Sequence, residues 1–233
     1  MRPLVISHAA CGGHAPANTL SGIRAALGFG VDAIEIDVQC SADGVPVVMH
    51  DYTVDRTTNG TGEVAKLTLD ELRSLDAGGE PPPTLAEVLD LTRGSTLLIC
   101  EIKQPGIEER LAEVILEADA LDDVMAWSFF PKALKGMRAA EPRVPAALLV
   151  SEQHADSLPS LRQTAVSLGV QGLSVYHAGV TNDTRALCRR YGLALFTWTA
   201  DDPEDIQRLI EAEVDGICTN FPDRVNDALG IHP

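Results

Sequence analysis

Residues 194–219 read ALFTWTADDPEDIQRLIEAEVDGICT, with two short apolar runs on either side of an amphipathic segment. The runs at 194–199 and 216–219 have the length of buried strands, and the pattern over 203–212 predicts a helix. Pro203 fits the first turn of that helix, where no backbone N–H is needed. The stretch therefore predicts a strand, a helix and a second strand parallel to the first.

The same unit recurs along the whole chain of 233 residues. Apolar runs predict eight strands, at 4–8, 33–38, 96–102, 124–128, 146–150, 172–175, 194–199 and 216–219. Helical patterns lie near 19–29, 84–93, 107–119, 131–140, 156–168, 183–191 and 203–212, and a short one follows Asp223. Asn18 and Thr84 are the expected N-caps. This alternation favours an α/β fold, a closed (β/α)8 TIM barrel, with an open doubly wound sheet as the alternative.

One segment interrupts the alternation. Residues 38–50 predict a strand, an Asp-Gly turn and a returning strand over 46–50, which we expect to form a hairpin arm above the barrel. Residues 51–83 are rich in Thr, Asn, Gly and Pro and contain one helical piece at 68–75. We therefore expect a single barrel domain over 1–233, with a hairpin and short cap insertion at 39–83 between the second and third barrel strands.

The composition excludes several classes of protein. The 18 Lys and Arg residues against 34 Asp and Glu residues give a formal net charge of −16, which argues against a nucleic-acid surface. No run approaches the roughly 18 apolar residues that span a bilayer, so no stable membrane insertion is expected. The five cysteines are scattered, with no Cys-x-x-Cys pair, which favours reduced thiols in a cytoplasmic protein. The sequence does not distinguish a monomer from a homo-oligomer.

Acidic side chains are found where barrel strands end. Glu35 and Asp37 alternate with Ile34 and Ile36, so both carboxylates are expected to face the barrel interior, and Glu101 ends the third strand. Three such carboxylates cannot stay ionised together without a cation, because each raises the pKa of the others. Oxygen ligands alone favour a hard divalent ion, so we expect Mg²⁺ or Ca²⁺ at this site.

Other polar residues follow the same strand ends. His8 and His50 are candidates for a general acid and a general base, since imidazole titrates near neutral pH. Lys103 adds a positive charge that, together with a metal ion, suits a phosphate group. Asp51 is expected either to orient His50 or to cap its loop, and Tyr176 either to line the pocket or to lie in a solvated loop.

A series of short motifs follows in one order along nearly the whole chain, at 35–39, 43–51, 55–62, 67–69, 75–78, 83–85, 101–103, 128–129, 197–199 and 214–222. In this order they resemble the glycerophosphodiester phosphodiesterase family. The resemblance implies a barrel, one divalent metal ion and cleavage of a phosphodiester to an alcohol and a phosphomonoester. It also implies a cyclic phosphate intermediate, formed when a neighbouring substrate hydroxyl attacks phosphorus.

The resemblance also assigns roles to individual residues of this chain. It places Glu35, Asp37 and Glu101 on the metal, His8 and His50 in acid–base catalysis, Lys103 on the phosphate and Trp198 beside the alcohol group.

Two departures from the family pattern lie in the first β–α loop. Ala9 and Ala17 stand where the family usually has an Arg and a Glu, so a bidentate phosphate clamp is missing. His14, or the amides of the adjacent glycines, are candidates to replace it. The cap at 77–83 is also shorter than usual, which is expected to leave a more open pocket.

These observations together predict a metal-dependent phosphodiester hydrolase that acts on a glycerophosphodiester or a related small-molecule diester, as expected of an enzyme of lipid and glycerol metabolism. One alternative is a phospholipase D-like transesterase that releases a cyclic phosphate. The other is a catalytically weak protein that binds a phosphate ligand. The pair of histidines argues against the binding protein, because binding alone does not need proton transfer.

Overall fold

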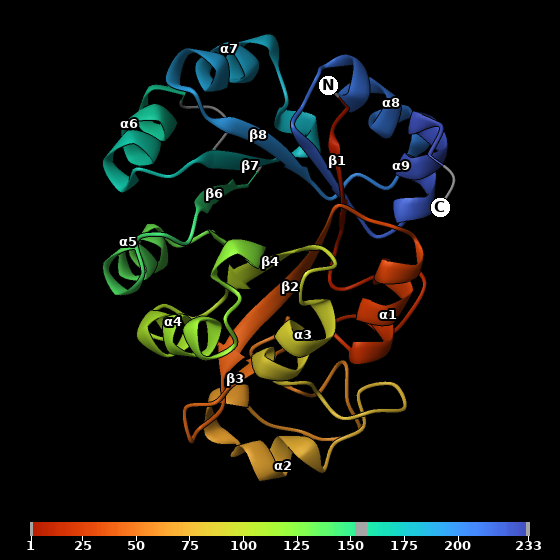
Figure 1. Ribbon diagram of the computed structural model, residues 1–233, viewed down its shortest axis with the longest axis vertical. Coiled ribbons are helices and arrows are strands. Elements are labelled where there is room, and N and C mark those ends of the chain that lie inside the picture. The colour runs from red at the N-terminus through yellow and green to blue at the C-terminus, as the bar shows by residue number, and fades with distance from the viewer. Residues whose placement is uncertain (1, 152–157, 232–233) are drawn as a thin grey trace.

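The strands of the computed structural model, which describes residues 2–151 and 158–231, form a closed barrel (Figure 1). The strands are β1 (Leu4–Ser7), β2 (Ala33–Cys40), β3 (Pro46–Val48), β4 (Leu97–Ile102), β5 (Val124–Ser128), β6 (Ala146–Val150), β7 (Gly172–Tyr176), β8 (Ala194–Trp198) and β9 (Gly216–Thr219). Their order is β1-β9-β8-β7-β6-β5-β4-β2-β3, and β1 also pairs with β2. All these pairings are parallel except β2–β3. The expected eight-stranded TIM barrel is confirmed, and the open sheet is wrong because β1 pairs on both sides.

Helices surround the barrel in the expected order (Figure 1). They are α1 (Leu20–Gly28), α3 (Leu85–Thr92), α4 (Glu108–Glu117), α5 (Pro131–Ala140), α6 (Leu158–Leu168), α7 (Asn182–Tyr191), α8 (Pro203–Glu211) and α9 (Pro222–Leu229). The first two residues of the helix predicted at 156–168 lie outside the described residues.

Thr84 caps α3 as expected, because its side chain accepts the backbone N–H of Glu87 in a capping box. The expected cap of α1 is wrong. Thr19, not Asn18, accepts the backbone N–H of Gly22. Asn18 has a left-handed backbone with φ of 58° and turns its side chain toward the barrel strands instead.

The barrel strands separate two apolar layers. Ile34, Ile36 and Cys100 belong to the larger core between the strands and the helices. Ile99 and Trp127 belong to a smaller core inside the barrel. Because side chains alternate along a strand, this arrangement turns Glu35 and Asp37 into the barrel, as expected from the sequence.

The insertion extends the end of β2. The strand β3 runs antiparallel to β2, with Val38 opposite Val48, and a short helix α2 (Leu69–Arg73) follows a 3₁₀ turn (Val64–Lys66). Side chains of this segment form a third apolar cluster of Val47, Met49, Val54, Val64 and Leu72. The predicted helix at 68–75 is therefore present but shorter, and this segment lies beyond β3 at one end of the molecule (Figure 1).

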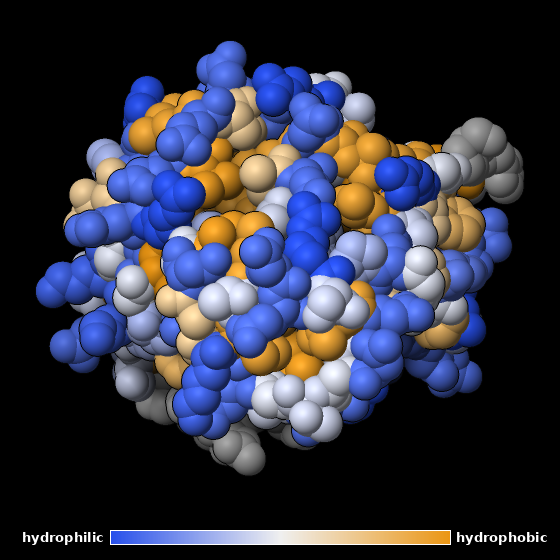
Figure 2. Space-filling model, turned by 90° about the horizontal axis from the view of Figure 1, so that it is seen from below, coloured by the Kyte–Doolittle hydropathy of each residue, from blue (hydrophilic) through white to orange (hydrophobic). Residues whose placement is uncertain are grey.

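The surface at this end is of mixed polarity. Figure 2 looks onto the insertion and shows hydrophilic side chains interspersed with smaller apolar areas. Over residues 2–151 and 158–231, none of the helices has the length and apolar character needed to cross a bilayer.

Candidate active site

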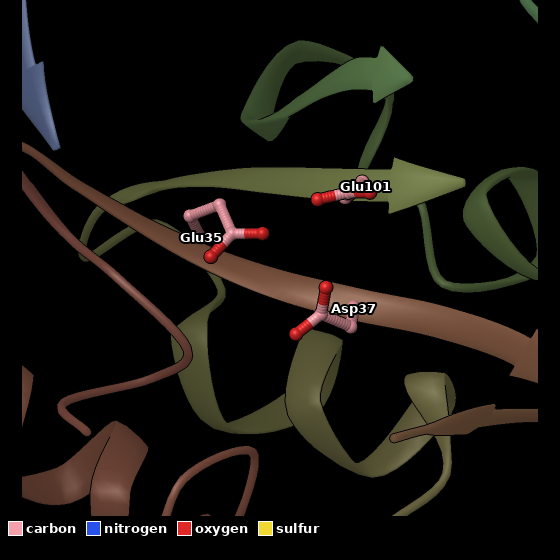
Figure 3. A group of neighbouring side chains, drawn as sticks. All are labelled: Glu35, Asp37 and Glu101. Carbon is pink, nitrogen blue, oxygen red and sulfur yellow. The ribbon is translucent and has the colours of Figure 1, made fainter. Parts of the chain in front are cut away.

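Three buried carboxylates come together on neighbouring strands. Glu35 and Asp37 belong to β2, and Glu101 on β4 pairs with Asp37 in the sheet register. One oxygen from each carboxylate lies within 4.8 Å of the other two, and Figure 3 shows all three turning toward a shared space. The three residues are 3%, 1% and 8% exposed, respectively. The structure thus places together the three acids that the sequence suggested as metal ligands.

Burial makes the negative charge of these acids costly. Burial, reinforced by the charges of Asp37 and Glu101, raises the pKa of Glu35 well above its ordinary value. Burial, and after it the charge of Asp37, raises the pKa of Glu101 to about 7. The folded protein therefore favours either protons or a cation at this position.

Lys103 supplies one positive charge to the cluster. Its Nζ atom lies 3.0 Å from Glu101 Oε1 and 3.4 Å from Asp37 Oδ1. Burial lowers the pKa of this ammonium, but the charges of Asp37 and Glu101 outweigh burial and hold its pKa above the ordinary value. One ammonium does not balance three carboxylates, so the all-oxygen donor set fits an additional hard cation.

His8 lies at the carboxyl end of β1 and is held from the far end of the chain. Its Nδ1 atom is 2.8 Å from Asn220 Oδ1. Asn220 Nδ2 in turn donates to Asp201 Oδ2 at 2.7 Å, and the Asn220 backbone N–H donates to Asp201 Oδ1 at 2.8 Å. A carboxylate can only accept hydrogen bonds, so the side-chain atom of Asn220 that faces Asp201 is the amide nitrogen. The amide oxygen of Asn220 therefore faces His8. His8 Nδ1 therefore carries a proton, and within residues 2–151 and 158–231 no hydrogen bond engages its Nε2.

His50 follows β3 and is held in a different way. Its Nδ1 atom is 2.7 Å from Asp51 Oδ1, and Arg56 donates to both oxygens of the same carboxylate. The hydrogen bonds from Arg56 hold the pKa of the Asp51 carboxyl well below its usual range. Asp51 is therefore in contact with the imidazole ring, and its role in orienting His50 stays a prediction.

Two connected hollows lie at these residues. The inner cavity is lined by His8, Glu35, His50, Glu101, Lys103, Trp127, Phe129, Leu149, Trp198, Thr199 and Cys218. The outer groove is lined by His50, Asp51, Tyr52, Thr53, Glu101, Lys103, Phe129 and Phe130. His50, Glu101, Lys103 and Phe129 border both hollows, so the inner cavity and the outer groove meet at these four residues.

Trp198 is a wall of the inner cavity and is firmly held. Its Nε1 donates to the backbone oxygen of Ser174 at 3.2 Å, and its ring packs edge-on against Phe129. Tyr176 packs against Trp198 as well, with ring centroids 5.5 Å apart. Tyr176 therefore affects the cavity through Trp198.

Residues 8–224 match the family model described as the glycerophosphoryl diester phosphodiesterase family. The chain belongs to this family. The matched residues include both histidines and all three carboxylates, and the resemblance inferred from the motifs is confirmed. The protein is accordingly an enzyme, a phosphoric diester hydrolase.

Members of the glycerophosphoryl diester phosphodiesterase family align with the chain over nearly its full length. It is 37% identical to a glycerophosphodiester phosphodiesterase of Caldanaerobacter subterraneus over 237 residues, which cover 96% of each chain. A crystal structure of glycerophosphodiester phosphodiesterase from Agrobacterium tumefaciens superposes with a TM-score of 0.85 at 29% identity, covering 97% of this chain and 100% of the other. A phosphodiesterase of Oleispira antarctica in complex with the product sn-glycerol-3-phosphate superposes with a TM-score of 0.88 at 28% identity. The superposition covers 98% of this chain and 97% of the other.

Ala9 and Ala17, the two positions expected to depart from the family pattern, lie close together in the first β–α loop. A Cβ atom built on Gly12 would lie 3.7 Å from the Cβ atoms of both Ala9 and Ala17, so the two altered positions are neighbours. Ala9 still acts through its backbone N–H, which donates to Glu35 Oε2 at 2.9 Å. His14, by contrast, pairs with Asp223 at 2.6 Å. The expectation that His14 replaces the missing Arg gains no support from these contacts.

Two residues of this family member were not predicted as site residues. Asn18 contacts Asp37, and Asn220 contacts His8. Asn18 carried a misleading signal, since its type and position suggested a helix cap. For Asn220 the usable signal was its position directly after the last strand, where polar side chains of a barrel enter the site.

Proposed function

We propose that the protein is a metal-dependent glycerophosphodiester phosphodiesterase that releases an alcohol and a phosphomonoester. The observation that supports this most strongly is the cluster of three buried carboxylates, two of which line the inner cavity together with both histidines. The names of the relatives and the product bound to the Oleispira antarctica enzyme favour a glycerol-linked diester as the substrate.

In this proposal Glu35, Asp37 and Glu101 hold one Mg²⁺ or Ca²⁺ ion. Bound there, the ion would balance the carboxylates and stabilise negative charge that develops on the phosphate oxygens. Lys103 Nζ, which already faces this space, binds a phosphate oxygen. Trp198 and Phe129 form an apolar wall that orients one alcohol group within the inner cavity.

The two histidines move protons through their Nε2 atoms, because Nδ1 of each is occupied by Asn220 or Asp51. One imidazole takes a proton from the attacking oxygen, and the other gives a proton to the leaving alcohol oxygen. The site is open beside His50, whose side chain is 47% exposed. The outer groove therefore gives the second alcohol a path to solvent.

Phosphorus NMR of the products tests this function. A panel of diesters with and without a vicinal hydroxyl is incubated with Mg²⁺, Ca²⁺ or EDTA. We expect a phosphomonoester to accumulate from glycerophosphodiesters and turnover to stop in EDTA. A persistent cyclic phosphate would point to the transesterase instead, and the absence of turnover with both ions would contradict the proposal.

Loss of the Asn220 side chain is expected to slow the reaction without weakening the metal site. The Asn220→Ala substitution removes the acceptor that fixes His8, so kcat falls by about 10- to 100-fold because the proton-transfer group is misplaced. Nitrogen-15 NMR of the imidazole would show His8 losing its single Nδ1-protonated form. An unchanged kcat together with an unchanged spectrum would contradict this role.

The matched control is Asn226→Ala. Asn226 is more buried than Asn220, and its Nδ2 donates to the backbone oxygen of Phe29 and not to His8 or His50. This variant is expected to lose stability while His8 keeps its tautomer.

A further inference from the structure

Asn18 makes two hydrogen bonds to the same residue. Its Nδ2 donates to Asp37 Oδ2 at 2.7 Å, and its Oδ1 accepts the backbone N–H of Asp37 at 3.1 Å. Asn18 is 5% exposed, and both bonds are remote from solvent. The carboxamide thus fixes the Asp37 side chain relative to its own backbone.

This clamp decides which oxygen of Asp37 remains available. Oδ2 is taken by Asn18, whereas Oδ1 faces Lys103 Nζ at 3.4 Å. One oxygen of Glu35 is engaged in a similar way, since Glu35 Oε2 accepts the backbone N–H of Ala9. The first β–α loop therefore engages one oxygen of each β2 carboxylate and leaves the other oxygen of each free of the loop.

Asparagine fits position 18 better than chemically similar residues do. An aspartate would lack the donor and would add a fourth negative charge beside Asp37. The backbone has φ of 58°, a left-handed conformation that Asn tolerates better than most residues. The backbone N–H of Asn18 also donates to the oxygen of Ala9, itself left-handed with φ of 47°. Such strained residues gather where the surrounding structure needs a particular geometry.

We propose that Asn18 is a positioning residue of the metal centre, which holds Asp37 so that Oδ1 is presented to the divalent cation. This inference rests on the function proposed above. A residue that hydrogen-bonds to a metal ligand orients that ligand before the ion arrives and so strengthens binding. Asn18 acts only through Asp37 and does not itself take part in the reaction.

The test measures binding of Mn²⁺, a hard cation that accepts oxygen ligands, from the EPR signal of the free ion. Asn18→Gly removes the clamp but keeps a residue that adopts positive φ freely. We expect Mn²⁺ affinity to fall by about 10- to 100-fold. The concentration of Mn²⁺ needed for half-maximal activity should rise in parallel. The loss of activity seen at low Mn²⁺ should largely disappear at saturating Mn²⁺, where kcat approaches the wild-type value. Asn226→Ala is the control and is expected to keep the wild-type affinity.

The outcomes separate this inference from the proposed function. Wild-type protein that binds no Mn²⁺ would overturn the metal site and the function with it. Wild-type binding together with unchanged binding by Asn18→Gly would overturn only the role of Asn18. A variant with a lower unfolding midpoint but unaltered Mn²⁺ affinity would show a purely structural role and would also overturn the inference. If circular dichroism shows that the glycine variant does not fold, Asn18→Ala is measured in the same way.

Discussion

Replacing either His8 or His50 by alanine lowers kcat on a glycerophosphodiester by about 100- to 10,000-fold, while Mn²⁺ binding stays close to that of the wild type. The reason is geometric. Both imidazoles border the inner cavity next to the carboxylates, and neither is needed to complete the set of three carboxylates. In the proposed mechanism each supplies one of two proton transfers, so the double variant is expected to lose much less than the product of the two single losses. Steady-state kinetics at saturating metal, together with EPR titration, measures both quantities.

His14→Ala is the matched control for these substitutions. His14 also pairs with a carboxylate, but its partner is Asp223, and its ring packs against Phe29. We expect this variant to keep wild-type kcat. The acid–base assignment is wrong if His8→Ala and His50→Ala both retain the full rate while the metal still binds.

In EDTA, the midpoint of thermal unfolding rises as the pH falls from about 7.5 to about 5.5. In the folded protein the pKa values of Glu35 and Glu101 are raised, so in this range the folded state binds more protons than the unfolded chain. Their contribution to stability is therefore fully present below the unfolded pKa and is lost as the pH rises through the folded pKa. For Glu101, a rise from 4.5 to about 7 corresponds to about 3 kcal/mol in total, of which about 2 kcal/mol falls within this range.

Such a change in stability shifts the midpoint by about 4–8 °C in a chain of this size. Saturating Mg²⁺ is expected to flatten the dependence, because the ion takes the place of the protons. Glu101→Gln should remove much of the slope in EDTA. Asp51 and Glu141 are carboxyls whose pKa is lowered in the folded protein. Their contribution to stability is lost only at more acidic pH, so it does not affect the dependence between pH 5.5 and pH 7.5. A midpoint that stays constant or falls toward pH 5.5 in EDTA would contradict the prediction.

The fold was largely predictable because each strand is a short apolar run bounded by polar or turn residues. The strand bounds agree to within two residues, including 33–38, which extends to Cys40 as β2. Closure of the barrel also followed from the count of units, because eight parallel strands can pair the first with the last. Helix caps were less predictable. Asn18 has the residue type of a cap, but a contact with Asp37 on the neighbouring strand outweighs its local preference.

The carboxylates were predictable for a different reason. Their alternation within β2 and the parallel register of β2 with β4 are sufficient to bring Glu35, Asp37 and Glu101 together. Hydrogen-bond partners distant in sequence were not predictable, because no local pattern connects Asn220 to His8. The direction in which His14 points likewise depends on α9 packing beside α1, which periodicity alone does not specify.

The contact between His8 and Asn220 joins residues 212 positions apart, at the first and last strands of the barrel. His8 is therefore synthesised well before the residue that fixes its imidazole ring. A nascent chain consequently contains all three carboxylates and both histidines before it contains the residue that orients His8. A product that ends before β9 would lack the acceptor for His8 Nδ1, so we expect its first imidazole to stay unoriented even where the other strands form.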